Sequence, residues 1–338
     1  MSKARELASL GNAYSDGALS NRNLIINGAM QVAQRGTSFS GPNNYAIDRW
    51  KANAIHPVYT VAQQSVTDLA GFSKCMRVQR NVGTTNNAYS IEVNQPVESL
   101  NTTSVVGKTV TLSFWARVGS DYAGDVDAFT STIAYHNLTG SDMGMEEGHF
   151  FAEFATTKVV QANTPSTDWT YYTMTADIAS DAYQVGVTIA TQSWVGTAGA
   201  NDYFEVTGVQ LEVGDTATPF EHRSYGQELA LCQRYYWKTT SADGSPFFGG
   251  CTAVRTHSGT NDYTASIDFP VEMRVAPTTS HSILNIHKPN VRLEAIASAS
   301  TSAANGKGMS ITVVPTTNDT TALAGFPYGG SIVADAEL

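Results

Sequence analysis

The sequence predicts a mainly β protein with a short N-terminal helix, a large antiparallel β-sandwich and a smaller C-terminal β-domain. Over most of the chain, short runs of apolar residues with period two alternate with Gly, Pro, Asn and Asp, which is the pattern of strands in sandwiches and barrels. Only 15% of the residues are charged, against roughly 25% in an average soluble protein. Thr, Ser, Asn and Gly take their place, and these residues suit extended chain and turns rather than exposed helices.

Residues 1–22 are expected to form a helix and a linker. Leu7, Leu10 and Tyr14 recur at helical spacing in a polar segment, which lacks the apolar centre of a signal peptide. A stripe of about three turns is marginal alone and must pack on something. It lies either on its own domain or against copies of itself or a neighbouring subunit, and in the second case it serves attachment and oligomerisation.

Residues 23–224 are expected to form the sandwich. Its runs include NLIINGAMQV, KTVTLSFWARV, DWTYYTMTADI and YFEVTGVQLEVG. Alternate residues from Val110 to Ala116 point to a core, which leaves Trp115 and Arg117 on the other face of that strand. In YFEVTGVQLEV the apolar residues share a face only if a bulge interrupts the register at Gly208.

Two further segments complete the expected organisation. Residues 121–167 lose the period of two and contain many Gly and acidic residues, so we expect a long insertion leaving one edge of the sandwich. Residues 225–338 begin with a brief helical stretch and return to short strands, which predicts the smaller β-domain. Its last strand stays apolar almost to Leu338, so we expect it to be paired in a sheet or a subunit interface.

Charge and cysteine content disfavour several classes. The 20 Lys and Arg against 30 Asp and Glu give a net charge of −10, which disfavours binding to nucleic acid. No apolar stretch of about 18 residues is present, so no membrane insertion is expected. Cys75, Cys232 and Cys251 are far apart and lack metal-binding spacing, which indicates buried free thiols in a protein made in a reducing cytoplasm.

Strings at three places in the chain resemble a known class of protein. They are NRNLIINGAMQVAQRGTS followed by YAIDRW, then GVQLEVGDTATPFEHRSYGQELALCQRYYWK, and finally FPVEMRVAPT with the closing IVADAEL. In this order they resemble bacteriophage tail fibres and related virion appendages, over nearly the whole chain. The resemblance implies a homotrimer on the virion exterior, made in the bacterial host cytoplasm, with other phage virion proteins as partners.

The middle of the first domain is similar to jelly-roll carbohydrate-binding modules. The strings that carry this likeness are FWARV, DWTYYTMT and YFEVTGVQLEVG. It implies a jelly-roll-like sandwich that binds glycans on a concave sheet face or in end loops, sometimes with a structural calcium ion. A host cell-surface glycan is therefore an expected partner.

No catalytic pattern is found in the sequence. A GxSxG elbow, a P-loop, a strand-linked GxGxxG and metal-spaced histidines are all missing, so we expect no enzyme and no catalytic residue. The acidic residues of 121–167 are interpreted as a solvated loop. No metal or cofactor is expected; the alternative is a structural calcium at Asp125 and Asp127, which lack the spacing of a calcium loop.

Two tryptophans are candidates for stacking on a sugar. Trp194 comes first, because it lies at a strand end among small residues in QSWVGTAGAND. Trp115 comes second, because it lies opposite the core face of its strand. For both, packing against another loop or subunit is the alternative, whereas Trp169 and Trp237 are interpreted as structural.

The sequence therefore predicts a non-enzymatic structural component of a phage virion, a tail fibre or appendage that contributes to adsorption on the host surface. The alternatives are a lectin whose main role is to recognise a receptor glycan, and a fibre mounted on the phage head.

Overall fold

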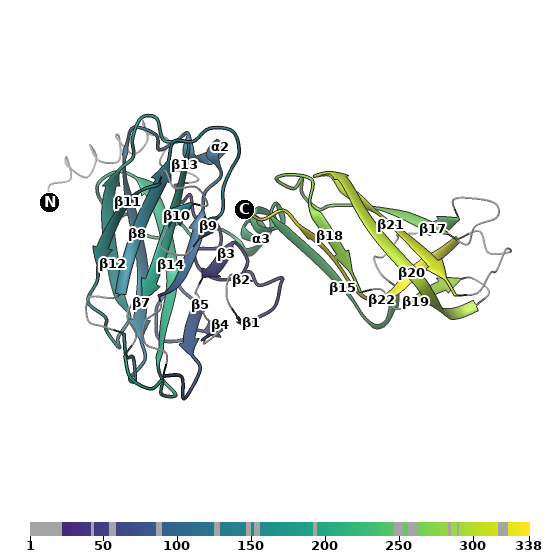
Figure 1. Ribbon diagram of the computed structural model, residues 1–338, viewed down its shortest axis with the longest axis horizontal. Helices are drawn as coiled ribbons and strands as arrows, with labels where there is room; N and C mark the ends of the chain where they lie inside the picture. The colour runs from purple at the N-terminus through teal and green to yellow at the C-terminus, as the bar shows by residue number, and fades with distance from the viewer. Residues whose placement is uncertain are drawn as a thin grey trace. The chain divides into compact units, whose positions relative to one another are not determined.

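The computed structural model describes residues 22–41, 44–53, 59–85, 90–124, 129–146, 150–151, 156–191, 195–246, 253–255, 262–282, 285–288, 291–316 and 324–338. Strands dominate these residues, beside the helices α2 (Ser99–Thr102) and α3 (Tyr225–Gln233), so the predicted mainly β class is confirmed (Figure 1). No helix in the described ranges is long and apolar enough to cross a membrane. One compact unit ends at Glu228 and the next begins at Leu229; we call them the sandwich unit and the C-terminal unit. The predicted helix with Leu7, Leu10 and Tyr14 lies outside the described residues.

The sandwich unit contains two six-stranded antiparallel sheets. Sheet A has the order β1 (Ser38–Ser40), β4 (Tyr59–Ser65), β5 (Lys74–Arg80), β14 (Tyr203–Val213), β7 (Thr109–Val118) and β12 (Thr170–Asp177). Sheet B has the order β11 (Thr156–Ala162), β8 (Phe129–His136), β13 (Gln184–Thr191), β6 (Ile91–Pro96), β3 (Trp50–Asn53) and β2 (Asn44–Ile47). Most neighbours are not consecutive in the chain, so the connections cross between the sheets, as in Greek-key sandwiches.

The core lies between the two sheets and follows the predicted alternation in β7. Leu112 and Phe114 are fully buried, and the Phe114 ring stacks on Tyr172 of β12 with the ring centroids 5.4 Å apart. The predicted bulge in β14 is also confirmed, because its register with β7 shifts between Thr207 and Gln210. Gly208 has φ +63° there, a backbone angle that favours glycine.

The segment 121–167 is not the edge insertion that the sequence led us to expect. It supplies β8 and β11 to sheet B, and β8 lies between β11 and β13 inside the sheet. Nearly every residue of β8 is buried. A strand that is buried on both faces does not need the regular alternation of apolar and polar residues that marks a half-exposed strand. The short strands β9 (Met145–Glu146) and β10 (Phe150–Phe151) pair with each other nearby.

The first two resemblance strings meet in the sandwich unit, where Asn23 connects them. Its side chain donates to the carbonyl oxygen of Val209 at 3.0 Å and accepts from the backbone N–H of Leu211 at 3.1 Å. Its backbone N–H donates to Glu221 at 2.9 Å, and its carbonyl oxygen accepts from Arg223. These contacts join the start of the domain to its last strand and to the segment that follows.

A turn at Asn27 and Gly28 extends this connection. Asn27 has φ +58°, its backbone N–H donates to Glu228, and its carbonyl oxygen accepts from the indole N–H of Trp50 at 3.1 Å. A Cβ on Gly28 would lie 2.1 Å from the Val209 carbonyl oxygen, so the close approach requires glycine. Trp50 is fully buried, and the contacts of these strings therefore join the start of the sandwich unit to its buried core and its last strand.

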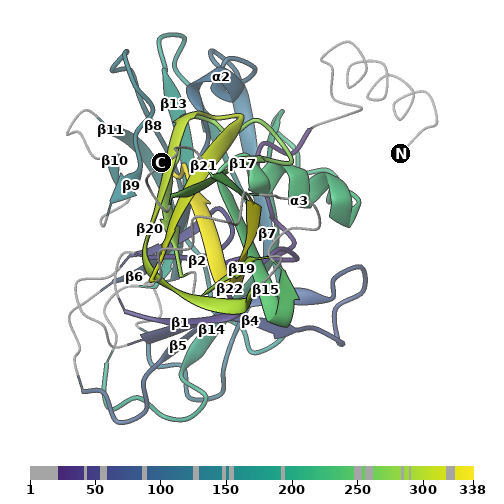
Figure 2. The same ribbon diagram turned by 90° about the vertical axis from the view of Figure 1, so that its right-hand side faces the viewer.

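The C-terminal unit is an antiparallel barrel closed by its last strand (Figure 2). Its strands are β15 (Tyr236–Pro246), β16 (Ala253–Arg255), β17 (Tyr263–Asp268), β18 (Thr278–His281), β19 (Asn285–Lys288), β20 (Val291–Asn305), β21 (Gly308–Pro315) and β22 (Ala324–Asp335). The pairings run from β22 through β16, β17, β21, β20 and β19 back to β22. β22 also pairs with β15 and β18, so the expectation that the last strand is paired is met within the unit.

Cys75 and Cys232 lie in the described ranges, where both are buried thiols outside any disulfide bond, as predicted. Burial raises the pKa of the Cys75 thiol, and the nearby Glu205 carboxylate adds to this effect. The thiol is therefore protonated and unreactive at neutral pH.

Candidate functional site

The outward face of sheet A carries the predicted residue Trp115. Trp115 lies opposite Tyr171 of β12 in the strand register, with the ring centroids 5.1 Å apart and the planes tilted by 44°. Tyr171 is 39% exposed, and Trp115 is partly exposed. Because aromatic and polar side chains meet here at the solvent boundary, the pair is a candidate for ligand contact.

A row of charged and aromatic side chains lies next to this pair. The guanidinium carbon of Arg117 lies 4.6 Å from the centroid of the Trp169 ring, and its Nε donates to Glu205 at 2.6 Å. Arg77 contacts the same carboxylate at 2.7 Å and lies 3.9 Å from the centroid of the Tyr203 ring. The period of two along each strand places these side chains on one face.

Asp68 completes the surface. It accepts from the indole N–H of Trp169 at 3.1 Å and from Arg117 at 2.5 Å, and these two contacts lower the pKa of its carboxyl group. Burial opposes the charge on Arg117, but Glu205 and Asp68 outweigh it and raise the guanidinium pKa. Both groups are therefore charged at neutral pH. We call Trp115, Tyr171, Trp169, Arg117 and Asp68 the sheet A strip.

One edge of Trp115 is packed against the protein. A Cβ on Gly208 would lie 3.2 Å from its Cδ1 and 2.7 Å from the Phe72 ring, and Phe72 itself packs against Phe220 and His222 at 5.2 and 5.3 Å between ring centroids. The bulge in β14 thus creates the space that these rings occupy. Trp115 therefore packs along one edge and is partly exposed.

The other residues that the sequence analysis singled out do not belong to the sheet A strip. Trp194, Asp125 and Asp127 lie outside the described residues. Trp237 packs edge-on against Phe269 at 5.5 Å between ring centroids, which confirms its structural interpretation. No group of three His, Cys, Asp or Glu side chains suited to a metal ion occurs in the described part of the chain.

Trp169 is the strip residue that the sequence interpretation missed. It immediately precedes β12 and contacts Arg117 and Asp68 with its ring and its N–H. A signal was present, because Trp169 and Tyr171 are two residues apart and share a strand face. The missing information was that β12 pairs with β7, which the sequence does not state.

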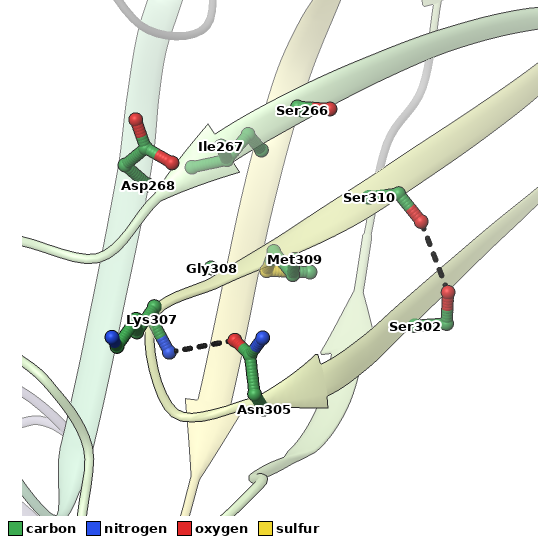
Figure 3. Close-up of a pocket in the computed structure, with 9 residues that line it drawn as sticks. All are labelled: Ser266, Ile267, Asp268, Ser302, Asn305, Lys307, Gly308, Met309 and Ser310. Atoms are coloured by element: carbon green, nitrogen blue, oxygen red, sulfur yellow. Dashed lines mark hydrogen bonds between the residues drawn. The ribbon is translucent and has the colours of Figure 1, made fainter.

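The C-terminal unit carries a hollow of about 370 Å³ on the outer face of β17, β20 and β21. Figure 3 shows Ser302 and Ser310 directed toward each other, with their hydroxyl oxygens 3.0 Å apart, and Asn305 and Lys307 joined in the turn between the strands. The lining contains no aromatic ring. It therefore offers hydrogen bonds but no surface for stacking, and the sheet A strip is the stronger candidate.

Comparisons with known proteins give distant likenesses only. No protein-family model matches the chain, and no curated protein matches it. Among solved structures, it is similar to the enzymatically active domain of tailspike protein 4 from bacteriophage CBA120, with 13% identity and a TM-score of 0.36. That match covers 57% of this chain and 22% of the tailspike chain, so it spans about a fifth of that protein.

Two carbohydrate-binding modules are also similar. One is the family 61 module TmCBM61 solved with β-1,4-galactotriose, at 14% identity, 57% coverage of this chain, 100% of the module and a TM-score of 0.32. The other is the C-terminal family 22 module of Clostridium thermocellum Xyn10B, at 13% identity, 56% and 100% coverage and a TM-score of 0.32. At these scores the likenesses have no weight for function.

Proposed function

We propose that the protein is a non-enzymatic structural component of a phage virion, a tail fibre or appendage, which contributes to adsorption by binding a host-surface glycan on the sheet A strip. The supporting observation is the set of partly exposed rings Trp115, Tyr171 and Trp169 on one face, beside the charged Arg117 and Asp68. The appendage role rests on the resemblance strings.

The strip has the chemistry that a sugar ligand requires. A pyranose ring presents an apolar face of C–H groups, which can pack on Trp115 and Tyr171, and a rim of hydroxyl groups. Arg117 supplies N–H donors and Asp68, whose side chain is 53% exposed, supplies acceptor oxygens along that rim. Arg117 pairs with both Asp68 and Glu205, and Arg77 also contacts Glu205. Two positive charges thus balance two negative ones, so a neutral or weakly charged glycan fits better than a strongly charged one.

The glycan proposal is tested by binding to an array of bacterial surface polysaccharides. Tyr171→Ala removes a ring on the edge strand β12, so it should abolish binding with little loss of stability. The matched control is Tyr225→Ala, because Tyr225 is 57% exposed at the start of α3 and lies outside the strip. Equal binding by the two variants and the native protein would exclude the strip.

Trp194 provides the alternative location for the same activity. If Trp194→Ala abolishes array binding while Tyr171→Ala has no effect, the glycan binds in the end loop rather than on the strip. Binding to no glycan at millimolar concentration would leave the architectural role alone. Incubation with host polysaccharide should release no new reducing ends, because the proposal includes no catalysis.

The appendage proposal has its own tests. Cryo-electron microscopy of the particle with a labelled copy of the protein should place it on the virion exterior, on the tail or, as the alternative, on the head. The residues Leu7, Leu10 and Tyr14 should face the particle. Mass photometry should give a homotrimer, and a monomer that remains monomeric at high concentration would contradict that part.

A further inference from the structure

The face of sheet B that is turned away from the core carries a buried row of polar side chains. Asn94 of β6 lies opposite Thr188 of β13, and Thr188 lies opposite Thr132 of β8 in the strand register. The residues between them along the strands, such as Val187, point into the core. We call Asn94, Thr188 and Thr132 the polar row.

The polar atoms of this row have no hydrogen-bond partner among the described residues. This applies to both amide atoms of Asn94 and to the hydroxyl groups of Thr188 and Thr132, and all three side chains are fully buried. The hydroxyl of Thr130 and Oδ1 of Asn53, on the same face, are also unpartnered. Buried polar groups in native proteins almost always have partners, so a whole row of them requires an explanation.

Residues 137–146, which we call the covering arm, close over the row. The Met145 carbonyl oxygen accepts from Asn53 at 3.0 Å and from Lys51 at 3.3 Å, both on β3. The Met145 side chain packs on Ala134 of β8. Since β6 and β13 lie between β3 and β8, Met145 lies above the strands that carry Asn94 and Thr188, and Figure 2 draws β9 and β10 beside β8.

Polar contacts among the described residues also hold the covering arm at its other end. Gln184 of β13 accepts from the backbone N–H of Met143 at 2.7 Å and donates to its carbonyl oxygen at 3.0 Å. Asp142 accepts from the backbone N–H of Ser99 at 2.9 Å. Each contact of this kind adds only modestly to stability, so a ligand that gains several hydrogen bonds can displace the arm.

We propose that the polar row is a second binding site, separate from the sheet A strip, which takes a neutral hydroxyl-rich ligand such as a saccharide segment once the covering arm moves. An amide and two hydroxyl groups offer donors and acceptors together, which matches a ligand whose hydroxyl groups do both. Lys51 and Glu92 on the same face carry opposite charges, so neither sign of ligand charge is favoured. At about 4.8 Å between strands the row spans about 10 Å, the scale of two linked sugar rings.

The site is tested on the full chain by methyl NMR with cellobiose, lactose, maltose and N,N′-diacetylchitobiose as probes at millimolar concentration. At least one probe should shift the methyl signals of Met145, Thr188 and Thr132 and leave that of Met174, in the core, unchanged. Indole N–H signals of Trp115 and Trp169 report the strip separately. Failure of all four probes to move the row signals overturns the proposal, whatever happens at the strip.

A matched pair of variants on β6 tests the row without depending on the choice of sugar. Gln95 is also buried, but its side chain exchanges two hydrogen bonds of 2.8 Å with the backbone of Ile26. Asn94→Leu should weaken the probe about tenfold or more while the melting temperature holds or rises, because unpartnered groups cost stability. Gln95→Leu should lower the melting temperature by about 5 °C. If Asn94→Leu lowers it equally, the row is a structural or hydrated element and the proposal falls.

Discussion

Polar side chains on the outward face of sheet A have hydrogen-bond partners, whereas several on the outward face of sheet B have none among the described residues. On sheet A, Arg117, Glu205 and Arg77 form a connected set with contacts of 2.6 to 2.8 Å. On sheet B, Asn94 and Thr188 are as buried as Glu205 but have no partner in the described part of the chain. Polar groups that bond within the protein stabilise the fold, and only their solvent-exposed atoms can also bind a ligand. Polar groups without a partner can make all of their hydrogen bonds to a ligand.

The largest expected effect comes from breaking a partnered charge on sheet A. Arg80 and Asp202 are both buried and lie 2.7 Å apart, and Asp202 also accepts from the backbone N–H of Ala123 at 3.2 Å. Asp202→Ala leaves the guanidinium buried without its counter-charge, which should cost about 3 to 5 kcal/mol. Urea denaturation measures this loss.

The control for that experiment is Asp68→Ala in the exposed part of the strip. Its carboxylate is in contact with Arg117 but is 53% exposed, so water replaces much of the interaction and the loss of stability should be far smaller. If the two variants lose equal stability, burial does not decide the value of these contacts and the comparison between the faces fails.

A matched pair of Thr→Val variants gives the next largest effect and compares the two faces directly. Thr207 of sheet A and Thr188 of sheet B are both fully buried, but the Thr207 hydroxyl donates to the Lys74 carbonyl oxygen at 2.8 Å. Thr207→Val should therefore cost about 1 kcal/mol. Thr188→Val should cost nothing or stabilise, because valine has the same shape and removes a buried polar group without a partner. Equal losses in urea denaturation would show that Thr188 has a partner after all.

The sequence was sufficient for those parts of the fold in which one face of a strand differs from the other. β7 alternates and its core face was predicted, and the bulge at Gly208 followed from the broken alternation in β14. β8, β13 and β6 are buried on both faces, so their alternation is hidden and β8 was taken for part of a loop. The physical reason is that burial of the second face depends on tertiary contacts, such as those of Met145 with Asn53 and Ala134, which a strand's own sequence does not report.

The candidate sites show the same limit. Trp115 could be chosen from the sequence because its strand has a recognisable core face. Trp169 could not be chosen from the sequence. Its place in the strip depends on the pairing of β12 with β7 and on its hydrogen bond to Asp68, which is 101 residues away in the chain. The polar row could not be predicted from the sequence either. Asn and Thr are common in strands, and whether they lack hydrogen-bond partners is known only once the positions of all neighbouring groups are known.

The smallest predicted effect concerns the exposed end of the strip and its dependence on pH. The hydrogen bond from Trp169 is the main reason that the pKa of Asp68 lies below its usual value of 3.8, and Arg117 adds to it. A carboxyl group whose pKa is lower in the folded protein stabilises the fold above its unfolded pKa, and this contribution disappears as the pH falls through the folded pKa. Trp169→Phe keeps a ring beneath Arg117 and removes only the N–H donor. NMR titration should therefore place the Asp68 pKa of the variant closer to 3.8 than in the native protein. An unchanged pKa would mean that Arg117 alone sets the charge of Asp68, and the indole would then be free to donate to a ligand instead.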